Sequence, residues 1–267
     1  MVLIPRLHLL EIHDQSWCPA AVRDGITDLI QTGLGWFRAY DAVAPLLARA
    51  LRRTDARRVV DLASGGGGPW PRFLGLLARE GAAPPVTLTD RFPNHRALER
   101  LRAVTRGALD FHPAPVDATA VPPDLPGFRT LFTSFHHFRP DDARAILGDA
   151  VRRGEGVAAF EITRRDPLSL VLNLLGVAAV LVAVPFIRPW RWDRLLFTYV
   201  IPLLPLAGAF DGFVSCLRTY SPGELRVLVA GWPQYDWEIG LARHHFLPMS
   251  ITYLIGTPRL SDRSAGG

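Results

Sequence analysis

Short apolar runs alternate with longer amphipathic stretches through most of the chain. The apolar runs fit buried strands, and the segments between them repeat apolar residues at intervals of three and four, which is typical of helices. Strands are expected at residues 59–61, 86–89, near 109, 130–135 and 156–162. Strands that alternate with helices in this way predict an α/β fold with a doubly wound, mostly parallel sheet.

Both ends of the chain depart from this alternation. In residues 14–55, apolar positions at helical spacing, such as Ile26 and Leu29, predict N-terminal helices. Near the C-terminus, residues 236–243 and 250–258 are two strand patterns with only a histidine-rich loop between them. We expect them to pair as an antiparallel hairpin at the sheet edge, which gives a sheet of seven strands.

A hydrophobic insertion follows the fifth predicted strand. Residues 168–187 contain only two polar side chains, which meets the length criterion for a transmembrane helix, and residues 195–210 form a second apolar run broken by two prolines. A hairpin that spans the membrane twice is disfavoured, because it would carry the arginines of residues 188–194 across against the positive-inside tendency. Two interpretations stay open: a lid over the active site, or a hairpin that dips into a membrane with Trp190 and Trp192 as interfacial anchors.

Composition supports a large folded core. The 267-residue chain is 49% hydrophobic and 21% charged, which argues against disorder. It contains no lysine, so its pI of about 9.8 reflects 30 scattered arginines, and without a basic run we expect no nucleic-acid partner. Cys18 and Cys216 lack the spacing of a metal site or a disulfide framework. The apolar first ten residues are too short for a signal peptide and are followed by Glu11 and Asp14, so a cytoplasmic location is expected.

Residues 59–73, reading VVDLASGGGGPWPRF, combine a strand, a glycine loop and the start of a helix. Glycines are needed where the backbone takes positive φ or lies against a ligand. A pyrophosphate is disfavoured here, because Asp61 would repel it and Pro69 and Pro71 lack amide donors. The same carboxylate favours a cationic ligand, such as S-adenosylmethionine with its sulfonium and ammonium groups.

This loop resembles the first motif of the class I S-adenosylmethionine-dependent methyltransferases, an acid followed by alternating glycines. Asp61, Gly65 and Gly67 match the motif, while Ala63 stands where the first glycine usually lies. Five parallel strands followed by an antiparallel hairpin are also that family's arrangement. The resemblance covers roughly residues 57–162 and, more loosely, the final hairpin. It implies a Rossmann-like fold, S-adenosylmethionine as cofactor and methyl transfer as the reaction.

The resemblance also implies contacts to the rest of the cofactor. Asp90 ends the second strand some twenty residues beyond the glycine loop, where a carboxylate can accept hydrogen bonds from both ribose hydroxyls. Asp117 and Ala118 match the position at which an acid and the next backbone amide meet the adenine. The alternative for both acids is an ordinary turn residue.

His136 and His137 follow the fourth strand, which in the resembling family ends beside the transferable methyl group. A histidine there can accept a proton from the acceptor, because its unperturbed pKa lies near neutrality. The alternative is that these side chains pack and bond to backbone. No third ligand at suitable spacing accompanies them, so the sequence predicts no metal site.

Candidate substrate contacts come from the flanks of the core. The predicted N-terminal helices cover the cofactor in the resembling enzymes, and their candidates for the pocket wall are Trp17, Trp36, Phe37 and Tyr40; simple helix packing is the alternative. Arg218 and Tyr220 follow the insertion and are candidates for binding a carboxylate or phenol. For Arg218, an ion pair with Asp211 is the plainer interpretation.

The chain therefore divides into an N-terminal helical cap (1–55), a cofactor-binding core (56–165 and 221–267) and the hydrophobic insertion (166–220). The capping-box pattern of Ser221 and Glu224 marks the helix that returns to the core.

The leading hypothesis is an S-adenosylmethionine-dependent methyltransferase that acts on a hydrophobic small molecule or lipid-like acceptor, with the inner face of a membrane as a candidate surface. One alternative is a membrane-associated binding or scaffold protein that keeps the fold without catalysis. The other is a nicotinamide-dependent oxidoreductase, which Asp61 and the two prolines of the loop disfavour. The acceptor atom and the oligomeric state are not specified by any pattern in the sequence.

Overall fold

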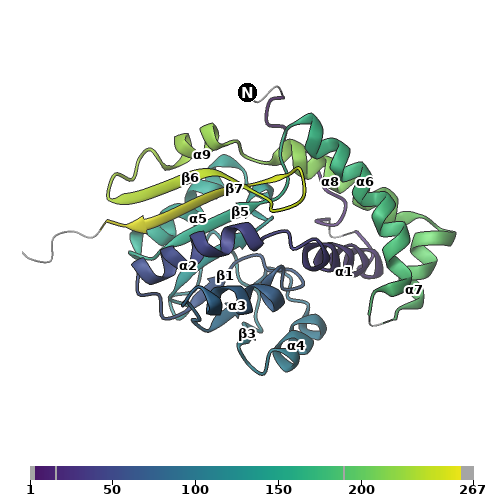
Figure 1. Cartoon of the computed structure of the whole chain (residues 1–267), viewed down its shortest axis with the longest axis horizontal. Helices are drawn as coiled ribbons and strands as arrows, with labels where there is room; N and C mark the ends of the chain where they lie inside the picture. The colour runs from purple at the N-terminus through teal and green to yellow at the C-terminus, as the bar shows by residue number, and fades with distance from the viewer. Residues whose placement is uncertain (1–3, 16, 189, 260–267) are drawn as a thin grey trace, which may run out of the picture.

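A seven-stranded sheet forms the centre of the protein (Figure 1). The computed structural model describes residues 4–15, 17–188 and 190–259. The strand order is β3-β2-β1-β4-β5-β7-β6, in which β1 to β5 are parallel and β7 runs antiparallel to both β5 and β6. The predicted doubly wound sheet with a C-terminal hairpin is confirmed. The strands are β1 (Val59–Asp61), β2 (Val86–Leu88), β3 (Leu109–Phe111), β4 (Phe128–Phe132), β5 (Val157–Glu161), β6 (Tyr235–Arg243) and β7 (Ser250–Pro258).

Helices cover both faces of the sheet, because successive strand residues point to opposite sides. Val59 packs into one core with α2 and α3, whereas Val60 packs into a second core with α5 and α9. The helical elements are α1 (Ala20–Trp36), η1 (Asp41–Val43), α2 (Ala44–Arg53), α3 (Trp70–Arg79), α4 (His95–Val104), η2 (Phe135–His137), α5 (Pro140–Arg152), α6 (Pro167–Ala183), η3 (Val184–Phe186), α7 (Trp192–Leu195), η4 (Leu196–Val200), α8 (Leu203–Arg218) and α9 (Pro222–Val229).

Local signals fix where several of these helices begin. Ser221 and Glu224 form the predicted capping box at the start of α9. Asp166 caps α6 by accepting a hydrogen bond from the Ser169 amide, and a proline follows at the first helical position.

The insertion packs against α1 and not directly on the sheet. Ile26 and Leu29 of α1 share a third apolar core with Val184, Ile187 and Leu204 of the insertion. In Figure 1, α6, α7 and α8 accordingly lie beside α1, at one side of the molecule. If the insertion serves as a lid, it would therefore reach the active site through α1 and the segment that follows η3.

Ion pairs also hold the insertion to α1. Arg191 and Arg194 both contact the Asp28 carboxylate, at 3.3 and 2.9 Å. A hairpin that crossed a membrane completely would break these pairs and the shared apolar core. The packing thus agrees with a hairpin that lies against the protein.

The outer surface of the insertion is unusually apolar. None of the side chains of α6 is buried, although the helix is composed almost entirely of apolar residues. By length and composition, Pro167–Phe186 is the one helix among the described residues that could cross a membrane, and the segments on either side of residues 201–202 form a second candidate only as a pair bent by 78°.

Candidate functional site

The glycine loop after β1 has the conformation that its sequence predicts. Gly65 and Gly67 both take positive φ, at 53° and 96°. A side chain at Gly67 would also collide with Leu101 of α4, since an added Cβ would lie 2.2 Å from that residue's Cδ1. Ala63 adopts φ of 51° in place of the glycine usual in the resembling motif. The backbone therefore takes the left-handed conformation at this position despite the alanine.

Asp90 lies beside this loop, directly after β2. Its Oδ2 accepts a hydrogen bond from the Gly65 amide at 2.8 Å, and its Oδ1 accepts one from the Phe92 amide. An added Cβ at Gly65 would meet no atom within 4 Å, so space is open on that side of the loop. The Asp90 carboxylate thus joins the glycine loop to the end of β2.

Asp117 and Ala118 follow β3. The Asp117 carboxylate is exposed and accepts hydrogen bonds from the amide and hydroxyl of Thr119, which lower the pKa of Asp117. Ala118 is buried. The hydrogen bond from the Val116 amide to the Asp90 carbonyl holds this segment against the end of β2.

Asp61 lies beneath the glycine loop and is almost fully buried. Its Oδ1 accepts a hydrogen bond from the Thr130 hydroxyl at 2.6 Å. Its backbone carbonyl accepts hydrogen bonds from the Ser64 hydroxyl and from the amide and hydroxyl of Thr89, which tie the loop to β2. Burial raises the pKa of Asp61 to about 7 against the opposing effect of these hydroxyls.

The stability of the ligand-free protein should therefore fall as the pH rises from about 4 to 7. Over this range the folded protein holds a proton on Asp61 that the unfolded chain releases. Each pH unit costs at most about 1.4 kcal/mol, with less near the two pKa values, so the total is on the order of 3 kcal/mol. Asp61→Asn should lack this slope, because the amide does not titrate. Urea unfolding of both proteins at several pH values measures the difference, and parallel profiles would contradict the assignment.

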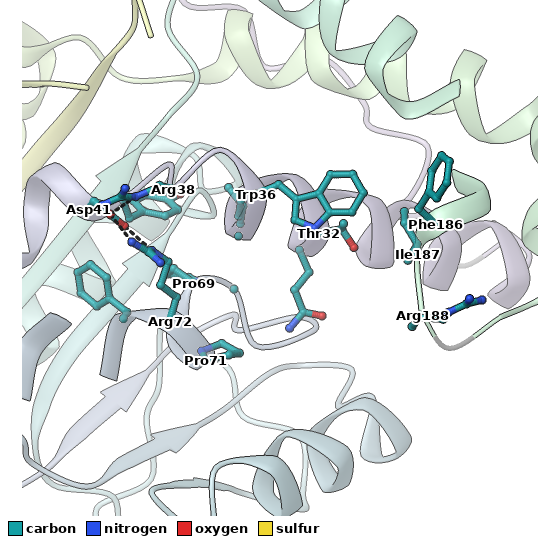
Figure 2. A pocket seen from close by; sticks show the side chains of 16 residues that line it. Thr32, Trp36, Arg38, Asp41, Pro69, Pro71, Arg72, Phe186, Ile187 and Arg188 are labelled. Carbon is teal, nitrogen blue, oxygen red and sulfur yellow. Dashed lines mark hydrogen bonds and ion pairs between the residues drawn. The ribbon is translucent and has the colours of Figure 1, made fainter. Parts of the chain in front are cut away.

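A cavity of about 470 Å³ opens next to the glycine loop. Figure 2 shows Thr32 and Trp36 of α1 between Asp41 on one side and Phe186 on the other. Gly68 at the end of the glycine loop also lines the cavity, but none of Asp61, Asp90 and Asp117 does. The cavity therefore adjoins the predicted cofactor contacts instead of enclosing them. Its lining residues are Gln31, Thr32, Leu34, Gly35, Trp36, Arg38, Tyr40, Asp41, Gly68, Pro69, Pro71, Arg72, Phe73, Phe186, Ile187 and Arg188.

Ion pairs shape one end of this cavity. Asp41 accepts hydrogen bonds from Arg38 at 2.7 Å and from Arg72 at 2.8 and 2.7 Å (Figure 2). Burial opposes ionisation of Asp41, but the two guanidinium groups hold its pKa below the usual value. The bonds fix the loop after α1 to the first turn of α3.

Tyr40 connects the cavity to the end of β4. Its side chain is buried, its ring contacts Phe132 edge-on, and its hydroxyl is hydrogen-bonded to the Thr133 hydroxyl. Burial raises the pKa of Tyr40 well above the usual value, so the phenol is neutral. Of the two predicted aromatic contacts from the N-terminal helices, Tyr40 lines the cavity, whereas Trp17 is 64% exposed and is not among the lining residues.

His136 and His137 follow β4 in η2, as predicted, but neither lines the cavity. His136 is buried with Nδ1 2.8 Å from Glu161, and His137 has Nδ1 2.9 Å from Asp14. Their catalytic role stays a prediction, and these contacts place them in a charged cluster with the N-terminal segment.

The predicted pairing of Arg218 with Asp211 is wrong. Arg218 contacts Glu11 at 2.9 Å and Asp14 at 3.2 Å, whereas Asp211 accepts hydrogen bonds from His13. Asp14 precedes Arg218 by 204 residues, and neither partner belongs to a periodic pattern. The acids and histidine within residues 11–14 are nevertheless a local signal of polar chemistry.

Tyr220 is not available to a substrate in this arrangement. Its ring is covered by the Arg6 guanidinium, 3.9 Å from the ring centre, and its hydroxyl donates to the Phe138 carbonyl. Packing and this one hydrogen bond occupy the whole side chain, so the contacts give Tyr220 a structural role.

Comparison with known proteins relates the whole architecture to solved structures. The plantazolicin methyltransferase BpumL in complex with SAH aligns with a TM-score of 0.59 at 9% sequence identity, over 93% of this chain and 95% of that one. BpumL in complex with a monoazolic desmethylPZN analog and SAH gives 0.53 at 7% identity, over 89% and 98%. The chain has the fold of a class I S-adenosylmethionine-dependent methyltransferase. Neither a family model nor a curated protein sequence matches the chain.

The methyltransferase fold gives the predicted residues a common location. The glycine loop, Asp90, Asp117 and η2 follow β1, β2, β3 and β4 in turn. They all lie beyond the carboxyl ends of parallel strands, where open α/β sheets bind their ligands.

Proposed function

We propose that this protein is an S-adenosylmethionine-dependent methyltransferase that acts on a hydrophobic acceptor. The observation that carries the proposal is the pair of acids at the glycine loop: Asp61 buried below it and Asp90 bonded to the Gly65 amide beside it. The fold is shared with BpumL, which was solved with SAH, the product of the proposed cofactor.

The chain's own residues suit each part of this cofactor. Asp90 would accept hydrogen bonds from the ribose hydroxyls, while Asp117 and the Ala118 amide would meet the adenine. Asp61, once ionised, would offset positive charge near the glycine loop. When bound, the cofactor supplies an electrophilic methyl group. The protein would contribute mainly by holding the acceptor close to that group and by excluding water.

The cavity beside the loop supports an apolar acceptor. Trp36, Phe186 and Ile187 provide its apolar wall, and Tyr40 reaches from it to the end of β4. An isothermal titration of the detergent-free protein with S-adenosylhomocysteine tests the proposal. Binding near one equivalent supports it, whereas no binding by the folded protein would contradict it and favour the scaffold alternative.

We also propose that the outer face of the insertion rests on a membrane. The exposed side chains of α6 and its neighbours are apolar over several turns, and Trp190 and Trp192 lie at one end with Arg188 over the Trp190 ring. Tryptophan and arginine are favoured at the membrane interface. The exposed apolar residues include Val171, Leu174, Leu175, Val182, Val200 and Leu206.

Replacing Leu174 and Leu175 together with arginine should reduce binding to lipid vesicles by at least tenfold. Both side chains are at least 60% exposed, so the protein should keep its fold while losing the buried apolar area that membrane contact provides. Val104→Arg and Val227→Arg, at equally exposed sites on other helices, are the matched controls. Vesicle co-sedimentation measures the effect, and equal losses in the controls would contradict a role for this face.

A further inference from the structure

The N-terminal segment carries a group of metal-ligating side chains against the end of the sheet. Glu11, His13, Asp14 and His137, here called the Glu11 cluster, each offer one ligand atom, and these atoms all lie within 4.8 Å of one another. Three of the residues precede α1, and His137 belongs to η2 after β4. His137 is also the predicted proton acceptor, whereas the other three residues have no role in the contacts proposed above for cofactor or acceptor.

Individual distances show how close the ligand atoms are. His137 Nδ1 lies 2.9 Å from Asp14 Oδ2 and 3.5 Å from Glu11 Oε2. His13 Nε2 lies 3.6 Å from Asp14 Oδ1. Ligands about 2.1 Å from a tetrahedral ion are roughly 3.4 Å apart, so small side-chain rotations would bring this set onto one ion.

Two buried atoms at the cluster make no hydrogen bond with the described residues. Glu11 is fully buried and its Oε2 makes no hydrogen bond, although a buried carboxylate oxygen is costly to leave unpaired. His136 is 1% exposed, and its Nε2 also lacks a hydrogen bond while facing Glu11 at 3.6 Å. A bound ion would supply an interaction that the surrounding side chains do not give to these two atoms.

The charges around the cluster favour a cation. Among the described residues, the carboxylates of Glu11, Asp14, Asp211 and Glu161 surround these imidazoles, and Arg218 is the guanidinium that contacts them. Nearby Arg6 donates instead to backbone carbonyls. Imidazoles that bind a metal ion are neutral ligands, so with an ion in place these four carboxylates outnumber the one guanidinium in contact with them, and a divalent ion would balance the excess.

The residues behind the cluster have the arrangement that supports metal ligands. Asp211 accepts from His13 through Nδ1, which leaves Nε2 of that ring to face Asp14. A carboxylate that orients an imidazole in this way is typical of residues behind metal-binding histidines. Arg218 meets Glu11 through Oε1 and leaves Oε2 to the cluster.

We propose that Glu11, His13, Asp14 and His137 bind a divalent transition-metal ion such as Zn²⁺, Mn²⁺ or Co²⁺. Two imidazoles with two carboxylates suit these ions better than Ca²⁺ or Mg²⁺, which favour oxygen ligands alone. His13, Asp14 and His137 are 22 to 34% exposed, which gives the ion a path from solvent. The ion would join the N-terminal segment to η2, beside the β4 end of the proposed active site.

Cobalt binding tests this site without an activity assay. The full chain, prepared without a histidine tag and dialysed against a chelator, is titrated with Co²⁺ and followed by visible absorption and calorimetry. We expect about one equivalent with d–d bands of a nitrogen- and oxygen-ligated ion, and competition by Zn²⁺. Asp14→Asn and His137→Gln should each weaken binding by at least tenfold.

Control variants separate this site from binding at other histidines. His245→Gln and Glu99→Gln alter exposed residues elsewhere and should bind Co²⁺ as the wild type does. Absence of stoichiometric binding by the wild type, or unchanged binding by folded Asp14→Asn and His137→Gln, would overturn the proposal. Glu11→Gln adds a second test, because the metal should raise the melting temperature of the wild type and not of this variant. S-adenosylhomocysteine titration is independent of these results, so the metal site and the proposed activity fail separately.

Discussion

Replacing Asp90 with alanine is expected to weaken S-adenosylhomocysteine binding by roughly 100-fold. The variant lacks the carboxylate and would lose its two charge-assisted hydrogen bonds to the ribose, which are worth about 3 kcal/mol together. It would also lose the bond that Gly65 donates at 2.8 Å, which fixes the loop before the ligand arrives. Both losses lower the affinity for S-adenosylhomocysteine.

Calorimetric titration of wild type and Asp90→Ala measures this loss. Asp90→Asn should lose less, because its amide oxygen can still accept from Gly65. Asp110→Ala is the control, since that exposed aspartate lies on the edge strand β3, and its affinity should match the wild type. Equal affinity in folded Asp90→Ala would exclude the ribose contact.

Replacing Arg129 with methionine is expected to lower the free energy of unfolding by about 3 kcal/mol. Arg129 is fully buried in β4 and contacts Asp149 at 2.5 Å and Glu155 at 3.0 Å. Without Arg129, Asp149 keeps, among the described residues, only its contacts with the more exposed Arg152 and Arg153. Loss of a partner in a buried ion pair costs far more than loss of an exposed pair. The strand that leads to Thr133 and η2 depends on this contact.

Urea unfolding measures the Arg129→Met effect. Arg57→Met is a matched control, because its ion pair with Asp55 is exposed on both sides and should contribute less than about 1 kcal/mol. A similar loss in both variants would show that burial does not strengthen the Arg129 contacts.

The sequence pattern predicted the core of the fold and much of the proposed cofactor site. Periodicity located the parallel strands and the C-terminal hairpin, since burial of one face or of both faces is a local property of a strand or helix. The glycine loop was equally predictable from the sequence, because positive φ restricts the residue type at each position. Asp61 was identified by its place at the end of one such strand, and Asp90 by its place just beyond the next.

Side-chain partners across long separations were not predictable in this way. Arg218 was paired with Asp211, its neighbour in sequence, and the structure pairs it with Glu11 and Asp14. Trp17 and Trp36 were both candidates for the wall of the acceptor pocket, yet only Trp36 of the two lines it. Helical periodicity indicates that one face of a helix is covered, but it does not identify the residues that cover it.

The sequence by itself determined the order of elements, the glycine turn and the acids at the ends of β1 and β2, because each depends on a few adjacent residues. Only the tertiary structure decided that the insertion packs on α1 and that His137 meets Glu11, His13 and Asp14. These contacts join segments more than a hundred residues apart. Their geometry follows from how the helices pack around the sheet, which no local pattern of hydrophobic and polar residues encodes.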